Sequence, residues 1–245
     1  MALIEEFVDR GDWLFRKRSY VPLLMFFISF LVFWADPNGI LFSGNNVWTF
    51  CSIALSLLGL LARLLVIGYV PHSTSGRNTG DQRAEVLNTK GMYSMVRHPL
   101  YLGNFLMWLG VLMFSRHPWL ILSGSIFYWS YYLLIMFTEE NFLRGKFGEL
   151  YLKWSEGRPA VFPNKIRWQS PELDFSIKNC IKREFYGVTA FVIGFAYVNF
   201  LHNIFQNNLY ILDLNWQYAS LGAIVFFIVI RFLKKQTKLF DISGR

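Results

Sequence analysis

Charged residues are scarce in this sequence. Asp, Glu, Lys and Arg make up only 16% of its 245 residues, whereas 54% are hydrophobic and 19% are aromatic. A typical soluble domain carries about 25% charged residues. The apolar residues are also gathered in runs rather than spread evenly, and contact with lipid explains such runs better than an oversized soluble core does. The composition therefore predicts an integral membrane protein.

Signals for several other classes of protein are missing. The two cysteines, Cys51 and Cys180, lack the spacing of a metal or redox site, and we expect no bound metal. No small-residue cleavage site follows the first apolar run, so we expect that segment to remain in the mature protein. The net charge of +8 is divided among the segments between apolar runs and forms no recognised nucleic-acid module. We therefore expect no nucleic-acid partner.

Six apolar runs are candidates for membrane-spanning helices, because roughly 20 helical residues cross a hydrocarbon layer of about 30 Å. One of them, Pro99–Phe114, would reach only about 25 Å as a helix, which leaves open whether it crosses the bilayer, tilts or re-enters. The expected fold is an all-α, polytopic transmembrane bundle of about six helices. The six runs are Tyr20–Ala35, Val47–Val70, Pro99–Phe114, Trp119–Thr138, Phe185–Leu201 and Tyr210–Leu233.

The distribution of positive charge predicts the orientation of this bundle. If both termini are cytoplasmic, the three outer loops contain a single arginine, Arg116, and no lysine. The remaining loops and both tails carry clustered Lys and Arg, which is the positive-inside pattern. The basic segments are Arg16–Arg18, Arg77–Arg97, Arg144–Arg183 and the tail from Lys234 onward. Among them, the loop Phe147–Arg183 is the only one large enough to form a cytosolic cap.

A first polar stretch lies around Pro99. Proline suits the first turn of a helix, where its missing N–H costs nothing. The free N–H groups of such a helix start, with Arg97 and His98 beside them, form a natural site for a carboxylate or phosphate. Tyr93 and Tyr101 add flat apolar faces with hydrogen-bonding tips. The alternative is that these residues only anchor the chain at the membrane boundary.

A second polar stretch is Glu139-Glu140, at the cytosolic end of the fourth predicted span. Adjacent helical residues point about 100° apart, so we expect at least one of the two carboxylates to face other helices. A carboxylate at this depth is costly unless it is paired or used. It could accept hydrogen bonds from ribose hydroxyls or an ammonium group, or face a sulfonium. The alternative is a solvated charge at a helix end.

Together the two stretches form an ordered pattern that covers roughly residues 50–165. It resembles the isoprenylcysteine carboxyl methyltransferase family, whose wider relatives include the phospholipid N-methyltransferases. The resemblance implies S-adenosylmethionine as cofactor and a lipophilic, membrane-embedded acceptor such as a lipid amine or an isoprenoid carboxylate. The pattern is Gly91-x-Tyr93-x-x-x-Arg97-His98-Pro99-x-Tyr101-x-Gly103, then Glu139-Glu140-x-x-Leu143-x-x-x-Phe147-Gly148-x-x-Tyr151, then Pro159-x-x-Phe162-Pro163.

The resemblance also implies a cofactor pocket that faces the cytosol. Tyr93, the run from His98 to Tyr101 and Glu139 match cofactor-contacting positions of that family, with Glu140 beside the last. Val86-Leu87-Asn88 matches a further contacting strip by position only, and Arg97 joins the set through the helix start. The full candidate set is Val86, Leu87, Asn88, Tyr93, Arg97, His98, Pro99, Leu100, Tyr101, Glu139 and Glu140.

The chain departs from the family pattern at three places. Met92 replaces a common proline, and Ile135 stands where the prenylcysteine enzymes have an arginine associated with the substrate. Gly157-Arg158-Pro159 replaces their basic-Val-Pro sequence, which leaves Arg158 as our candidate for a contact with the acceptor. These departures argue against a prenylcysteine carboxylate as the acceptor. No isolated His–carboxylate dyad indicates a general base, so we assign no catalytic residue.

The sequence predicts a methyltransferase-like core over residues 1–165 and an extension over 166–245 with two further membrane helices. That extension could line a lipid entry groove or mediate oligomerisation, and a purely structural role is the simpler expectation; no oligomeric state is predicted.

Two other functions stay open: an NADPH-dependent membrane reductase of the sterol or steroid type, and a non-enzymatic membrane protein. The methyltransferase interpretation requires that the segments around His98 and Glu139 meet in one site.

Overall fold

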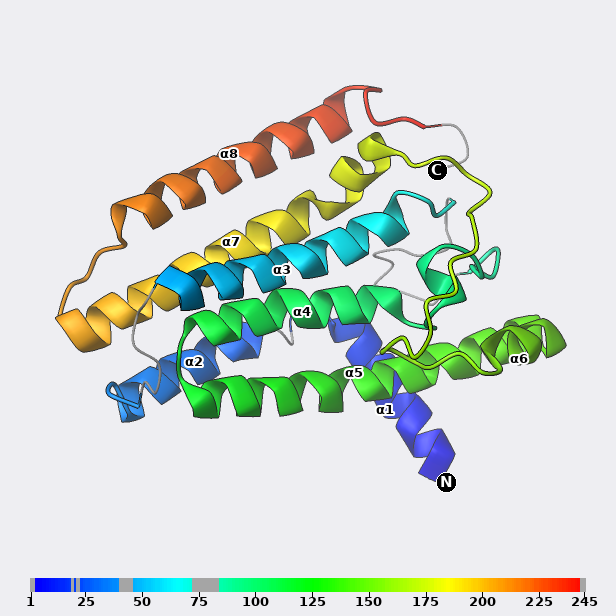
Figure 1. Ribbon diagram of the computed structural model, residues 1–245, viewed down its shortest axis with the longest axis horizontal. Coiled ribbons are helices and arrows are strands. Elements are labelled where there is room, and N and C mark those ends of the chain that lie inside the picture. Colours follow the sequence, from blue (N-terminus) through cyan, green and yellow to red (C-terminus); the bar gives the residue numbers. More distant parts are fainter. Residues whose placement is uncertain (1–2, 19, 21–22, 40–45, 72–83, 243–245) are drawn as a thin grey trace.

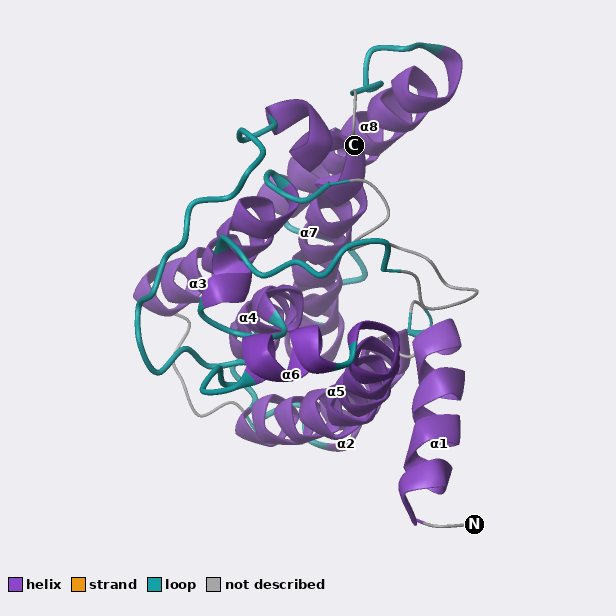
Figure 2. Cartoon of the chain, turned by 90° about the vertical axis from the view of Figure 1, so that its right-hand side faces the viewer, coloured by secondary structure: helices purple, strands orange, loops and turns teal. Residues whose placement is uncertain are grey.

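The computed structural model describes residues 3–18, 20, 23–39, 46–71 and 84–242. The described residues form α-helices and one short 3₁₀ turn, η1 (Met92–Ser94), with no strand among them (Figures 1 and 2). The all-helical part of the prediction is therefore confirmed. The helices are α1 (Leu3–Lys17), α2 (Leu23–Ala35), α3 (Asn46–Ile67), α4 (Pro99–Phe114), α5 (Pro118–Phe147), α6 (Glu149–Ser155), α7 (Ile177–Asn207) and α8 (Leu214–Gln236).

Each of the six predicted apolar runs coincides with a helix. Four of these helices, α3, α5, α7 and α8, are long and apolar enough to cross a membrane, whereas α2 and α4 have only 13 and 16 residues. The number of crossings and the cytoplasmic location of both termini stay predictions. Three predicted segments fall partly outside the described residues, namely the start of the first run, the basic stretch that begins at Arg77 and the end of the basic tail from Lys234 onward.

Helices α3 and α4 pack unusually close because small residues face each other along their contact. A Cβ added to Gly59 would lie 2.5 Å from the carbonyl oxygen of Gly103, and one added to Gly110 would lie 2.4 Å from that of Ser52. Small residues that let helix backbones approach are typical of helix contacts in membranes. Figure 1 shows α3, α4 and α5 side by side, with α7 beside α3 and α8 along the outer edge.

Helix α1 was not predicted. Figure 2 shows it apart from the other helices except α5, on which it packs at one end of the bundle. A Cβ on Gly11 would collide with Thr138 of α5, so glycine is required for this approach. Phe7 packs edge-on against Phe137 of α5. Trp13, on the other side of α1, is exposed, as expected for a helix that lies at a membrane surface.

The long basic loop Phe147–Arg183 is more structured than predicted. It contains α6, and α7 begins at Ile177 instead of near Phe185. The residues between these helices run along the stretch that precedes α4, where Gln169 accepts a backbone hydrogen bond from Gly91. The segment therefore covers the end of the bundle at which α3 and α5 end and α4 and α7 begin.

Candidate functional site

The stretch before α4 is held by the segment that follows α6. The backbone N–H of Arg97 donates to Pro159 at 3.0 Å, and that of His98 donates to Ala160 at 2.8 Å. These bonds satisfy N–H groups that a non-helical stretch could not satisfy by itself. Pro99 is the first residue of α4, as predicted, and His98 is its N-cap. The backbone hydrogen bonds of Arg97 and His98 on one side and the start of α4 on the other therefore fix the position of the His98 ring.

The His98 segment and the end of α5 meet at this ring. The Nε2 atom of His98 lies 2.8 Å from Oε1 of Glu140, and its Nδ1 atom lies 3.5 Å from Oε2 of Glu139. The ring is buried, with 4% of the side chain exposed. The predicted convergence of the two segments is thus confirmed. Both glutamates, rather than one, face the other helices.

Two neighbours of His98 complete the hydrogen bonding of these carboxylates. Tyr101, one turn along α4, donates from its hydroxyl to Oε2 of Glu139 at 2.8 Å, and its ring stacks on the His98 ring. Arg97 donates from Nε to Oε1 of Glu140 at 2.9 Å. Glu140 therefore hydrogen-bonds with His98 and Arg97, whereas Glu139 accepts from Tyr101 and lies within ion-pairing distance of His98.

The electrostatics of the site follow from this arrangement. Burial by itself would lower the pKa of His98, but hydrogen bonds and charge attraction from Glu139 and Glu140 outweigh it and raise this pKa above its ordinary value. The two carboxylates therefore favour the protonated form of His98. The carboxylates remain partly open, with side-chain exposures of 34% for Glu139 and 27% for Glu140. The two carboxylates are thus more open to a ligand than the imidazole behind them, which is covered.

An apolar cluster adjoins the carboxylate of Glu140. Tyr151 and Trp154 of α6 pack with Leu87 and Tyr93, two of the predicted cofactor residues. Burial and the neighbouring Glu140 raise the pKa of the Tyr151 hydroxyl, which therefore stays neutral.

Three further predicted residues, Val86, Asn88 and Leu100, are not part of this cluster. Val86 is exposed, and Asn88 and Leu100 are half-buried. Whether any of these side chains contacts a cofactor stays a prediction.

Arg158 binds backbone carbonyls. Its guanidinium donates to Trp154 and, at 3.3 Å, to Ser94, and it lies over the Trp154 ring. These contacts connect the end of α6 to η1. They give Arg158 a structural role that does not require a bound substrate. The predicted contact between Arg158 and an acceptor therefore stays a prediction.

The departure at Ile135 lies inside the protein. This side chain is fully buried among Phe15, Tyr128, Tyr131 and Tyr132, one turn before Glu139. The position that carries an arginine in the prenylcysteine enzymes is here part of an aromatic core, and an arginine would place a charge in that core.

A polar group that the sequence analysis did not single out joins α3, α4 and α7. Arg63 of α3 forms an ion pair with Glu184 of α7 and also donates to Asn104 of α4. A signal for it was present, because Arg63 is the one charged residue in the predicted span Val47–Val70. A charge within a membrane span is rare unless it is paired or functional.

Comparisons with known proteins agree with the motif pattern. Residues 47–150 match the family model for phospholipid methyltransferases, and this segment includes His98, Glu139 and Glu140. Over 78 residues the chain is 33% identical to the Protein-S-isoprenylcysteine O-methyltransferase of Schizosaccharomyces pombe. That match covers 32% of this chain and spans about a third of the relative, 33% of its length. No solved structure matches the chain significantly.

Proposed function

We propose that this chain is a membrane methyltransferase dependent on S-adenosylmethionine. The premise is that residues 47–150 match the model of the phospholipid methyltransferase family. Its acceptor would be a lipophilic molecule that reaches the site from the bilayer. The observation that carries the proposal is the meeting of His98 with Glu139 and Glu140 at one end of an apolar bundle. Neither a reductase nor a non-enzymatic protein finds comparable support in the matches.

The residues at this point have the chemistry that the cofactor needs. S-adenosylmethionine is a polar molecule with a sulfonium, an ammonium, a carboxylate and ribose hydroxyls. Glu139 and Glu140 would accept from the hydroxyls or the ammonium, and the partly exposed Arg97 would face the carboxylate. His98 is covered behind the two glutamates and would hold them in place. Leu87 and Tyr93 would cover the apolar faces of the adenosine. Charge of both signs beside an aromatic cluster thus fits such a ligand.

The chain's own contribution to the reaction would be positioning. The bound cofactor supplies an electrophilic methyl group, and methyl transfer is an in-line displacement whose rate depends strongly on alignment and exclusion of water. Both nitrogens of the His98 ring are directed at carboxylates, so neither faces an acceptor. The role of the site would therefore be to align the reactants, and we do not assign His98 as a general base.

The identity of the acceptor is narrowed by Ile135. This position offers no cation to a substrate carboxylate, and the guanidinium of Arg158 is engaged by backbone carbonyls. Both observations support an acceptor other than a prenylcysteine carboxylate, although the fission yeast relative is named for that reaction. A lipid amine or another amphiphile that needs no carboxylate contact fits better.

Binding of S-adenosylhomocysteine, the demethylated product, tests the proposal. Titration calorimetry on the purified protein in detergent should give saturable binding. The variants Glu139→Gln and His98→Gln should weaken that binding by about 10- to 100-fold, because each removes a charged hydrogen-bonding partner worth about 1.5–3 kcal/mol.

A matched control is Glu149→Gln, which changes an exposed carboxylate on α6. It should bind like the wild type. Undiminished binding in both site variants would refute the site assignment, and no binding by the wild type would refute the cofactor.

A further inference from the structure

Arg63 and Glu184 form a buried ion pair between α3 and α7. Arg63 donates from Nε to Oε2 of Glu184 at 2.7 Å and from a terminal nitrogen to Oε1 at 2.6 Å. The two side chains are 12% and 2% exposed. This is the two-pronged geometry in which an arginine binds a carboxylate most specifically. Since an unpaired charge is very unfavourable in apolar surroundings, each of these residues fixes the other.

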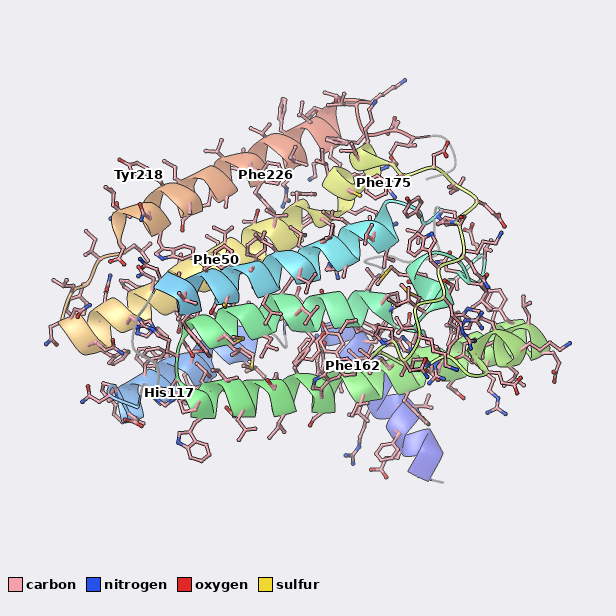
Figure 3. The ribbon with its side chains drawn as sticks, in the orientation of Figure 1. Phe50, His117, Phe162, Phe175, Tyr218 and Phe226 are labelled. Carbon is pink, nitrogen blue, oxygen red and sulfur yellow. The ribbon has the colours of Figure 1, made fainter. Side chains whose placement is uncertain are left out.

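The position of Glu184 relative to Arg63 is determined by contacts at the start of α7. The N–H of Ser176 donates to Gly68 at 2.9 Å, and the amide of Asn179 donates to Ile67 at 2.7 Å. The Phe175 ring, labelled in Figure 3, occupies the space that a side chain at Gly68 would need. The start of α7 thus satisfies carbonyl groups at the end of α3, and Glu184 is placed beside Arg63 as a result.

Arg63 in turn orients Asn104 of α4. A terminal nitrogen of its guanidinium donates to Oδ1 of Asn104 at 2.6 Å. Because Oδ1 faces a donor, the amide NH₂ must point the other way, toward the Tyr132 hydroxyl of α5 beside it. Gly103 makes room for this contact, since a Cβ there would lie 2.5 Å from Cγ of Arg63. Gly103, the last residue of the sequence pattern around Pro99, therefore leaves room for the aliphatic part of the Arg63 side chain.

Tyr132 connects this group to the candidate site. Its ring lies 4.9 Å from that of Tyr101 and 4.2 Å from that of Tyr128. The Tyr128 hydroxyl donates to the carbonyl of Tyr101 at 2.7 Å. Tyr101 then donates to Glu139 at 2.8 Å. A continuous set of contacts thus runs from Glu184 through Arg63, Asn104 and the tyrosines to a carboxylate of the site.

We propose that Glu184 is a positioning residue of the candidate site. By holding Arg63 against Asn104 it fixes Tyr132 and, through it, Tyr101 and Glu139. The extension 166–245, which lies outside the segment matched by the family model, would therefore complete the site. This inference rests on the proposed function for its reaction, but the positioning of Tyr101 can be measured separately.

The test compares three variants. Glu184→Gln removes one charge, whereas Arg63→Met with Glu184→Met removes both and leaves no unpaired buried charge. Thr189→Val is the matched control on α7, because its hydroxyl bonds to Phe185 and Ala223 rather than to this network. Size-exclusion profiles and melting temperatures identify the folded variants, and two readouts follow: the Kd for S-adenosylhomocysteine and the ¹⁹F resonance of a fluorotyrosine placed at position 101.

We expect the folded double variant to bind S-adenosylhomocysteine about tenfold more weakly than the wild type and to shift the ¹⁹F resonance, while the control changes neither. A folded double variant with wild-type Kd and resonance would overturn the inference. If the wild type itself does not bind, the proposed function fails. The ¹⁹F resonance then decides alone: a shift supports positioning by Glu184, and an unchanged resonance refutes it.

Discussion

At the scale of single residues, the site depends on how charge is distributed around one imidazole. His98 is covered, yet it is surrounded by two carboxylates, so its buried charge is compensated. Arg97 and Tyr101 add donors from the same stretch of chain. The result is a pair of partly exposed carboxylates whose orientation is fixed by groups behind them. Such preorganisation is what a reaction governed by alignment requires.

The raised pKa of His98 predicts how stability depends on pH. A histidine whose pKa is higher in the folded than in the unfolded state stabilises the fold fully below its unfolded value, about 6.5, and loses that contribution as the pH rises through the folded value. The melting temperature of the wild type in detergent should therefore fall more steeply between neutral and alkaline pH than that of His98→Gln. Parallel pH profiles for the two proteins would contradict this assignment.

At this scale the sequence indicated the site but not what surrounds it. The sequence predicted a helix start at Pro99 and a functional role for His98 and Glu139 at a membrane boundary. Both predictions use only residues that are close together in the sequence. Arg63 and Glu184 are 121 positions apart, and their pairing depends on how α7 packs on α3. Arg158 had suggested a substrate contact, and only the structure shows the carbonyl groups that it binds.

At the scale of helices, the contact between α3 and α4 is the most sensitive to side-chain size. Gly59→Leu would place atoms where the Gly103 carbonyl and the backbone of Met107 lie. Overpacking of this kind usually destabilises by about 1–3 kcal/mol. We expect a lower melting temperature and weaker S-adenosylhomocysteine binding, since α4 carries His98 and Tyr101.

The matched control is Gly222→Leu on α8, where nothing lies within 4 Å of the added Cβ. This variant should keep the wild-type melting temperature. Equal melting temperatures for the two leucine variants would show that the α3–α4 approach tolerates bulk and would contradict the packing described above.

Long apolar runs were enough to predict six helices, because lipid exposure leaves a strong compositional signal. The same criterion overlooked α1 and α6. Helix α1 mixes acidic and basic residues and is apolar on one face only, so it resembles a charged tail in composition. Helix α6 has seven residues and depends on packing by Tyr151 and Trp154. The apolar face of α1 is an amphipathic pattern that could have revealed this helix in the sequence. Helix α6 is recognisable only from the surface against which it packs.

At the scale of the whole molecule, the polar groups of the candidate site gather at one end of an apolar bundle. Helices α3 and α5 end there, α4 and α7 begin there, and the segment after α6 covers them. Positive charge in the sequence predicts that this end faces the cytosol. A polar cofactor would then approach from water and a lipophilic acceptor from the bilayer. Helix α7 of the extension is joined to α3 by the ion pair between Glu184 and Arg63.

The most direct test of the central claim is transfer of an isotopically labelled methyl group. Purified protein in nanodiscs would be incubated with membrane lipid extract and S-adenosylmethionine labelled in its methyl group, and the lipids would be analysed by mass spectrometry. We predict a labelled lipophilic product with the wild type and with Glu149→Gln, and about 10- to 100-fold less with Glu139→Gln. Equal labelling by wild type and Glu139→Gln, or no labelled lipid in any sample, would contradict a methyltransferase site at His98 and Glu139.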